Sequence, residues 1–183
     1  MANNSEILSD FEPKGSHLYL IDANILMYLF SPIASYAIGR QETISRFFDK
    51  CRSVNSGLIT TSSVIGEFFH VNLSIYYTNW CRAQKDQISF DLKKHYRPTE
   101  DFKDSVTAIN SSIGAILKLT QKFPDNFSNI NIDSVLKNCF DSEFTDSYLL
   151  ELSNQNNWFI VSNDKDLLNH PKRTQLLITP NFN

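Results

Sequence analysis

The chain has 183 residues, a length typical of one domain with a sizeable core, and it is 42% hydrophobic and 20% charged. The formal net charge of −3 and the calculated pI near 5.8 exclude nucleic-acid binding through bulk positive charge, so such binding would need local patches or metal ions. No membrane-length apolar run or signal-peptide pattern is present. Three widely separated cysteines fit neither a disulfide framework nor a zinc pattern, and we expect a soluble, cytoplasmic protein.

The N-terminal part of the chain is predicted to hold a leader and then the first strand. Residues 1–16 are expected to form a flexible leader before a single domain at 17–183. Residues 18–21 form a short, continuous apolar run, which is typical of a buried parallel strand. The apolar spacing after this run predicts a helix that ends near Pro32.

A second strand and a long helix follow a further helical segment. Residues 58–60 are predicted to form the strand, with Thr61 or Ser62 as the N-cap of the helix beyond it. Apolar residues at helical spacing define one face of that helix. These residues are Val64, Phe68, Val71 and Ile75.

The central part of the chain is predicted to be helical after a polar, basic loop at 85–98. The clearest helix begins at Thr99 and ends before Pro124. Its apolar stripe comprises Phe102, Val106, Ile109, Ile113, Ile116 and Leu117. We expect a short third strand at 129–132, with Asp133 capping a brief helix that reaches residue 140.

The C-terminal part is predicted to return to the sheet. Asp141 or Ser142 is expected to cap a helix that ends at a turn near 154–157, and residues 158–161 form a strand. Residues 176–178 are expected to form a last edge strand. Strands that alternate with helices indicate an α/β fold of three layers, α/β/α, around a central, mostly parallel sheet.

Four acidic residues lie next to the predicted strands. Asp22 directly follows the first strand, Glu67 lies early in the helix after the second, and Asp164 follows the strand at 158–161. Because ligands of parallel sheets bind outside the carboxyl ends of the strands, connectivity alone places these three acids at one edge. Asp146 joins them only if its helix begins near that edge.

Each acid also has a plainer structural interpretation. Asp22 can cap a helix, and Glu67 and Asp146 can be first-turn acids that the helix dipole favours. Asp164 can be an ordinary turn residue, and Asp166 can cap a short helix. The functional interpretation therefore depends on the joint arrangement of the acids.

The order of these motifs resembles that of the PIN domain family of metal-dependent nucleases. The resemblance is carried by the stretches "LYLIDANIL", "LITTSSVIGEFF" and "FTDSYLLELSNQNNWFIVSND". In the last stretch, Asp164 matches the family's last acid. Ser162 matches the Thr or Ser that stands two residues before that acid. The resemblance covers roughly residues 17–180. The chain departs from compact family members in a longer helical segment at about 80–128 and in Ser147-Tyr148, where small residues are common.

The resemblance implies hydrolysis of RNA phosphodiester bonds with Mg²⁺ or Mn²⁺. Converging carboxylates repel one another by about 1 kcal/mol per pair at 4 Å in water, and hard cations with oxygen ligands offset that repulsion. Asp22, Asp146 and Asp164 are the expected ligands. Glu67 is expected to hold a second ion or to orient the attacking water.

Other polar residues are candidates for supporting roles. Asn24 and Ser162 can each hydrogen-bond a ligand carboxylate and fix its rotamer, or make only a local turn or cap bond, and Asp166 is grouped with them. A basic group can position substrate phosphates or be a solvated face, and it comprises Arg40, Arg46 and Lys50. An aromatic group can stack unpaired bases or pack in the core, and it comprises Tyr76, Tyr77 and Trp80.

Several other classes of protein fit the sequence less well. A haloacid-dehalogenase-like phosphatase needs a second Asp where the chain has Asn24, and dinucleotide-binding and P-loop folds need glycine patterns that are missing. An inactive PIN-like domain that binds RNA or protein remains the alternative. A nuclease of this kind is either a toxin with an antitoxin partner or a housekeeping RNA-processing enzyme. The resemblance also implies a homodimer, for which the helix at 99–122 is a candidate contact, although an amphipathic helix of this kind is more often packed in the core.

Overall fold

The computed structural model describes residues 5–32, 38–84, 89–170 and 177–179. Its centre is a six-stranded sheet of order β1-β6-β5-β2-β3-β4, and every pairing of neighbouring strands is parallel. The predicted sheet is therefore confirmed, and it is parallel throughout rather than mostly parallel. The strands are β1 (Ser5–Ile7), β2 (Leu18–Ile21), β3 (Gly57–Thr60), β4 (Gln121–Lys122), β5 (Phe159–Val161) and β6 (Leu177–Thr179).

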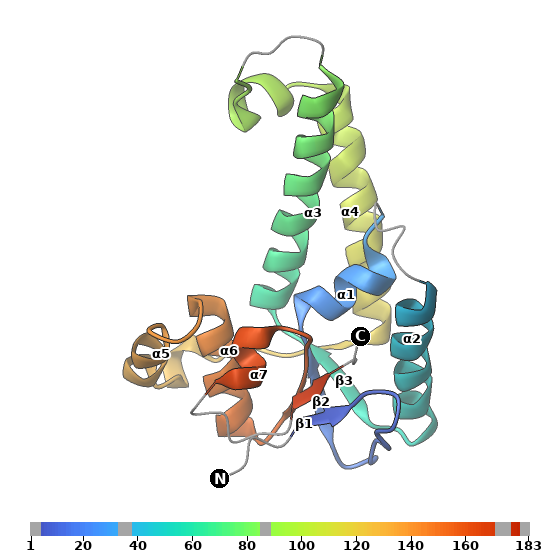
Figure 1. The fold of residues 1–183 in the computed structure, drawn as a ribbon, viewed down its shortest axis with the longest axis vertical. Helices are drawn as coiled ribbons and strands as arrows, with labels where there is room; N and C mark the ends of the chain where they lie inside the picture. The colour runs from blue at the N-terminus through green and yellow to red at the C-terminus, as the bar shows by residue number, and fades with distance from the viewer. Residues whose placement is uncertain (1–4, 33–37, 85–88, 171–176, 180–183) are drawn as a thin grey trace.

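Helices cover both faces of this sheet and complete the predicted three layers. Figure 1 shows α1 and α2 on one side of the strands and α5, α6 and α7 on the other. The helices are α1 (Ala23–Phe30), α2 (Ile38–Ser53), α3 (Ser62–Ala83), α4 (Glu100–Leu119), α5 (Ile132–Asn138), α6 (Phe144–Asn156) and α7 (Lys165–Asn169). Short turns of π-helix (η1, Leu92–Tyr96) and 3₁₀-helix (η2, Phe127–Asn129) are also present. No helix in the described ranges has the length and apolar character that a bilayer crossing requires.

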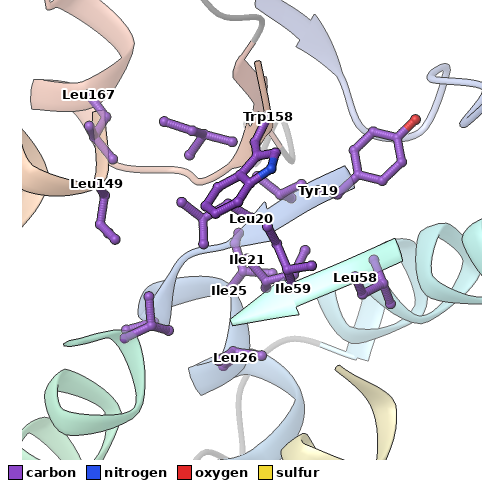
Figure 2. Packing of buried hydrophobic residues seen from close by; sticks show 14 of the residues in the cluster. Tyr19, Leu20, Ile21, Ile25, Leu26, Leu58, Ile59, Leu149, Trp158 and Leu167 are labelled. Carbon is purple, nitrogen blue, oxygen red and sulfur yellow. The ribbon is translucent and has the colours of Figure 1, made fainter. Parts of the chain in front are cut away.

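β2 lies in the middle of the core because its apolar run suits a strand that is covered on both faces. Its last three residues are fully buried. Figure 2 shows the side chains of β2 and β3 between α1, which contributes Ile25 and Leu26, and the helices that carry Leu149 and Leu167. The strand therefore ends in a rigid setting, with Asp22 as its next residue.

The segment predicted to be a flexible leader is part of the fold. β1 pairs in parallel with β6, and Leu8 and Phe11 are buried in the core. The ring of Phe11 meets that of Tyr19 edge-on, with centroids 5.8 Å apart. The prediction is therefore wrong for residues 5–16. β6 is also not an edge strand, because β1 lies outside it.

α3 and α4 form a long pair that projects from the sheet, as Figure 1 shows. Of the two predicted caps of α3, Thr61 is the N-cap and accepts from the backbone N–H of Val64. Thr99, predicted as the first residue of its helix, is the N-cap of α4 and accepts from the backbone N–H of Phe102. Within the predicted loop, residues 92–96 form the π-helical turn η1 instead, and residues 85–88 lie outside the described ranges.

The apolar face predicted for α3 is only partly correct. Val71 is 39% exposed, whereas the neighbouring Asn72 is fully buried. The Asn72 amide accepts a hydrogen bond from Ser31 Oγ at 2.5 Å and donates to the carbonyl of Phe68 at 2.8 Å. A polar residue occupies the core here because its hydrogen bonds are satisfied there, and it ties the end of α1 to α3.

The strand predicted at 129–132 is wrong. Residues 127–129 form η2, and Asn131, not Asp133, caps α5 by accepting from the backbone N–H of Ser134 at 3.2 Å. The alternation of Asn and Ile imitates a strand, but an Asn side chain competes for backbone hydrogen bonds and favours a cap. β3 pairs with β2 on one side, and the strand on its other side is β4, which is two polar residues long.

The two ends of α6 also differ from the prediction. Its N-cap residue is Glu143 rather than Asp141 or Ser142, and the Glu143 side chain makes no capping hydrogen bond. The helix continues through Asn156, so the predicted turn is reduced to Asn157, whose φ of 56° is left-handed. Asn tolerates this conformation better than most residues do, and the chain enters β5 directly afterwards.

Candidate functional site

Asp22 occupies the junction between β2 and α1. Its backbone is extended, and its N–H continues the strand pairing by donating to the carbonyl of Val161 at 3.1 Å. The Asp22 side chain is 2% exposed and accepts a hydrogen bond from Ser162 Oγ. The chain thus places a nearly inaccessible carboxyl group at the carboxyl end of its central strand.

Ser162 connects Asp22 to the loop after β5. Its Oγ donates to Asp22 and accepts from Asn24 Nδ2 at 3.2 Å and from the backbone N–H of Asp164 at 2.9 Å. Asn24 Oδ1 is buried and has no hydrogen-bond partner among the described residues. Ser162 therefore bonds the carboxyl of Asp22 directly, whereas the Asn24 side chain reaches that carboxyl only through Ser162.

Asp164 caps a short helix, which is a local structural role. It is the N-cap of α7, and its Oδ1 accepts from the backbone N–H groups of Asp166 at 2.7 Å and Leu167 at 3.3 Å. Asp166 contacts Asp164 through its backbone N–H, and its own side chain is exposed. Asp166 is therefore not the cap of this helix.

Glu67 and Asp146 reach the same place from two helices. Glu67 lies in the second turn of α3, and its Oε2 is buried without a hydrogen-bond partner in the described part of the chain. Asp146 lies in the first turn of α6, and its carboxyl is repelled by Asp164, Asp22 and Glu67. α6 therefore begins near the edge where the strands end, as the sequence argument for Asp146 required.

The pKa values of three of these carboxyl groups are raised. Burial raises the pKa of Asp22 to about 6, and the charge of Asp164 adds to this effect, although the hydrogen bond from Ser162 opposes it. The pKa of both Glu67 and Asp146 is raised to about 7, mainly by burial and to a smaller extent by the negative charges of neighbouring acids. Mutual repulsion shows that Asp22, Glu67, Asp146 and Asp164 converge, and we call these four residues the acidic site.

A fifth acid, Glu143, was missed from the sequence. Its charge contributes to the raised pKa of both Glu67 and Asp146. Glu143 precedes Asp146 by three residues, and such a pair lies on one face of a helix. This spacing is a signal that could have identified it.

The acidic site has the donors that a hard cation requires. No three His, Cys, Asp or Glu side chains within the described ranges already stand in an arrangement that would hold a metal ion. The free oxygens Glu67 Oε2 and Asn24 Oδ1 are nevertheless buried beside carboxyl groups with raised pKa values. Carboxylate and amide oxygens are what Mg²⁺ and Mn²⁺ prefer, so these residues fit such an ion.

Of the three basic residues predicted to contact substrate, only Arg40 lies near the acidic site. Its guanidinium donates to Tyr28 Oη at 3.3 Å and lies over the ring, 5.7 Å from the centroid. The same hydroxyl accepts from Asn163 Nδ2 at 3.2 Å, and Asn163 stands between Ser162 and Asp164. This contact links the start of α2 to the loop after β5.

The other two basic residues, Arg46 and Lys50, lie farther along α2. Arg46 pairs with Glu42 at 3.4 Å, and Lys50 pairs with Glu12 at 2.7 Å. α2 runs from Arg40 toward the amino end of β3, so these two residues lie progressively farther from the acids. The structure does not bring them to the acidic site.

The aromatic residues near the outer end of α3 pack against one another. The ring of Trp80 lies 6.4 Å from that of Tyr77 and 5.2 Å from that of Tyr96. Tyr76 is nine residues beyond Glu67 on α3, or about 13 Å along the helix axis. These residues therefore pack where α3 and α4 meet η1, away from the acids.

Comparison with solved structures establishes the class of fold. One similar structure is VapBC2 from Rickettsia felis bound to a DNA fragment from its promoter, with a TM-score of 0.51 and 12% identity over 88% of this chain and 98% of that chain. Another is PAE2754 from Pyrobaculum aerophilum, with a TM-score of 0.47 and 14% identity over 92% of this chain and 88% of that chain. No family model matches the sequence, and no curated protein is significantly similar to it. The chain thus has a PIN-like α/β fold.

Proposed function

We propose that the protein is a metal-dependent endoribonuclease that hydrolyses phosphodiester bonds at the acidic site. The observation that carries this proposal is the set of raised pKa values at one edge of the sheet, together with the buried, unpartnered oxygen of Glu67. Perturbed carboxyl groups that converge on one place are typical of catalytic and metal sites.

Asp22, Asp146 and Asp164 are the residues that would hold Mg²⁺ or Mn²⁺. The ion would supply electrostatic stabilisation of the charge that develops on the phosphate and would lower the pKa of the attacking water. Ser162 orients Asp22 through its hydrogen bond, while its contacts with Asn24 and Asp164 keep that hydroxyl in place.

Glu67 is assigned to the attacking water or to a second ion. A carboxyl group with a pKa near 7 changes protonation near neutral pH, and its free Oε2 can accept a hydrogen bond from water. Both roles need the ionised form of Glu67. Burial disfavours that form in the absence of a cation, so the occupied site would lower this pKa.

The proposed partners are an RNA substrate and an antitoxin protein. The similar structure of VapBC2 supports the setting of a toxin–antitoxin pair, and a small antitoxin gene next to this one would distinguish that setting from housekeeping RNA processing. A homodimer and a cytoplasmic location belong to the same proposal. Ile109 and Ile116 of the apolar stripe are fully buried, and α4 packs against α3 and α1, so a dimer would need other residues of that helix.

The decisive experiment is the cleavage of a labelled, unstructured RNA with and without Mn²⁺. Wild-type protein should cleave only with the metal, and Asp22→Asn should be inactive while retaining its circular dichroism spectrum. Asp133→Asn is the matched control, because Asp133 is an exposed acid on α5 that contacts none of the acidic site.

The alternative of an inactive RNA- or protein-binding domain makes a different prediction. Folded wild-type protein would leave the RNA intact and would show no heat of Mn²⁺ binding in a calorimetric titration. Metal binding without cleavage would instead indicate an enzyme that is selective for another RNA.

A further inference from the structure

A cavity of about 480 Å³ lies at the outer end of the α3–α4 pair, which projects from the sheet in Figure 1. We call it the tip pocket, and its lining includes Tyr76, Trp80, Tyr96, Asp101, Asp104 and Ser105. Its volume is within the range of small-ligand sites, about 300–1,000 Å³. Tyr76 is about 13 Å from Glu67 along the axis of α3, so the tip pocket is separate from the acidic site.

Aromatic rings form part of the lining and are held in place by their neighbours. Trp80 is half-buried, and its ring lies 6.4 Å from that of Tyr77 and 5.1 Å from that of Phe90. The ring of Tyr96 lies 5.2 Å from that of Trp80, and the Tyr96 hydroxyl is hydrogen-bonded to Ser105 Oγ at 2.7 Å. A fixed aromatic surface attracts cations as well as apolar groups. The rings alone therefore do not identify the occupant.

Two carboxylates on α4 also line the tip pocket. Asp101 and Asp104 are exposed, and neither carboxylate has a hydrogen bond or an ion pair in the part of the chain that the structure describes. Among the described residues, none with a basic side chain lines the pocket. Both carboxylates therefore keep their acceptor positions for a ligand, and their charge favours a cation.

The helix dipole explains only one of these two acids. α4 begins at Glu100, so Asp101 lies in the first turn, where the dipole favours an acid, whereas Asp104 lies beyond that turn. The two acids are three residues apart on one helical face, where like charges repel. Lys103 does not offset this repulsion, because it pairs with Glu100 at 2.6 Å. A cation bound in the tip pocket would offset it.

We infer that the tip pocket binds a guanidinium group, the arginine side chain of a partner protein. A guanidinium has five N–H donors and a flat face, so it can donate to Asp101 and Asp104 while it stacks on an aromatic ring. A lysine ammonium is compact and strongly hydrated, and it uses a flat ring less well. An apolar side chain would leave the carboxylates without a partner, and a phosphate would be repelled by them.

Two side-chain amides at the pocket favour a peptide chain over a small cation. Asn79 and Gln84 belong to the lining, and such amides can bond both the N–H and the C=O groups of a peptide backbone. Gln84 Nε2 donates to the carbonyl of Trp80 at 3.2 Å, which positions the Gln84 side chain. The projection of α3 and α4 in Figure 1 also lets a protein reach the pocket without contact with the sheet. The inference goes beyond the proposed function and does not depend on it.

Titrations followed by the indole N–H signals in ¹H–¹⁵N spectra test the inference. The chain has two tryptophans, and Trp158 is 3% exposed and outside the tip pocket, so only the signal of Trp80 should move. The probes are end-blocked alanine pentapeptides with a central arginine, lysine or norleucine. The arginine peptide should bind most tightly, the lysine peptide less tightly and the norleucine peptide least.

Asp104→Asn should weaken binding of the arginine peptide about 2–5-fold, as expected for the loss of one exposed ion pair. Glu100→Gln is the matched control, because it removes the same charge from the same helix end while Glu100 lies outside the lining. It should bind the peptide as wild type does. Equal weakening in the two variants would overturn the inference, because binding would then follow overall charge.

The other probes exclude different occupants. A norleucine peptide that bound as tightly as the arginine peptide would overturn the inference in favour of an apolar occupant. Propylguanidine should bind more weakly than the arginine peptide, and equal or tighter binding would overturn the assignment to a protein chain. A uridine hexamer that moved the Trp80 signal when the arginine peptide did not would assign the pocket to RNA. A Trp80 signal that no probe moved would show that the tip pocket is not a binding site of this kind.

Discussion

The two edges of the sheet differ in whether their acidic side chains form ion pairs. At the amino edge, where α2 ends and β3 begins, acids and bases are paired: Lys50 with Glu12 at 2.7 Å and Arg52 with Asp49 at 2.6 Å. At the carboxyl edge, none of the ion pairs found among the described residues includes an acid of the acidic site. Both edges belong to one small sheet, so the fold itself does not require unpaired acids. Burial and mutual repulsion of the acids at the carboxyl edge cost free energy of folding, and a binding function would explain why the protein keeps them there.

The largest expected difference between the edges is in activity. Asp146→Asn should lower the rate of Mn²⁺-dependent RNA cleavage at least about 100-fold, because it removes a ligand charge that the transition state needs. Lys50→Met at the amino edge should leave the rate within about twofold. Initial rates under single-turnover conditions measure both. Equal loss in the two variants would remove the functional distinction between the edges.

The next effect should be on metal affinity. Ser162→Ala removes the hydroxyl that donates to Asp22 and receives bonds from Asn24 and Asp164. The loss of such a supporting contact typically weakens metal binding about 10–100-fold. Calorimetric titration with Mn²⁺ measures the change, and Ser134→Ala on α5 is a matched control. Unchanged affinity in Ser162→Ala would show that Asp22 needs no orientation by this hydroxyl.

The acidic site should also make stability depend on pH in the metal-free protein. The pKa of Asp146 is raised to about 7, so ionisation costs folding energy above that pH, and the cost disappears as the pH falls from 7 toward 4. Asp146→Asn should therefore be more stable than wild type by about 2 kcal/mol at pH 8, after allowance for screening of a half-buried group, and should lose this advantage by pH 4.

Thermal melts of the two proteins in EDTA at pH 4, 6 and 8 measure this dependence. For a chain of this length, about 2 kcal/mol corresponds to a rise in Tm of roughly 4–8 °C at pH 8. An advantage of Asp146→Asn that stayed constant with pH would indicate better packing rather than relief of repulsion.

Metal should stabilise the wild-type protein by a smaller amount. Mn²⁺ at ten times its dissociation constant should add about 1.4 kcal/mol to the free energy of unfolding at pH 7.5. Denaturant unfolding with and without Mn²⁺ measures it, and Asp22→Asn should show little of this gain. A response to Mn²⁺ that is equal in both proteins would place the ion elsewhere.

The smallest effect is expected at the amino edge. Glu12→Gln removes an ion pair whose acid is 78% exposed, and pairs of this kind contribute about 0–1 kcal/mol. Its effect on Tm should be close to the error of measurement and should vanish in 1 M salt. A loss above about 2 kcal/mol would show that pairing at this edge also matters to the fold.

The sequence predicted the central strands, and the positions of the acids relative to them, because the physical signals there are local. β2 is a continuous apolar run, and the change to Asp22 marks its end. The caps Thr61 and Thr99 are also local signals, since a hydroxyl next to a helix can accept from its first N–H groups. Because the predicted strands are parallel, the acids that follow them (Asp22, Glu67 and Asp164) could then be assigned to the carboxyl edge of the sheet.

The remaining features depend on contacts that the sequence does not display. β1 is three residues long and exists only through its pairing with β6, and β4 is two exposed polar residues beside β3. Asp125 and Tyr148 come together only once α6 lies against the loop after β4. Neither hydrophobic periodicity nor motif order contains this information.

The pairing of β1 with β6 has a consequence for synthesis on the ribosome. Ser5 is matched with Leu177, so β1 can find its partner only after the whole stretch from β2 to β6 has been made. β2, β3 and β5 can pair with one another earlier, because all three are made before β6. Contacts between such distant positions form slowly, and nascent chains tend to fold from the N-terminal side first. The docking of β1 should therefore be a late step of folding that closes one margin of the sheet.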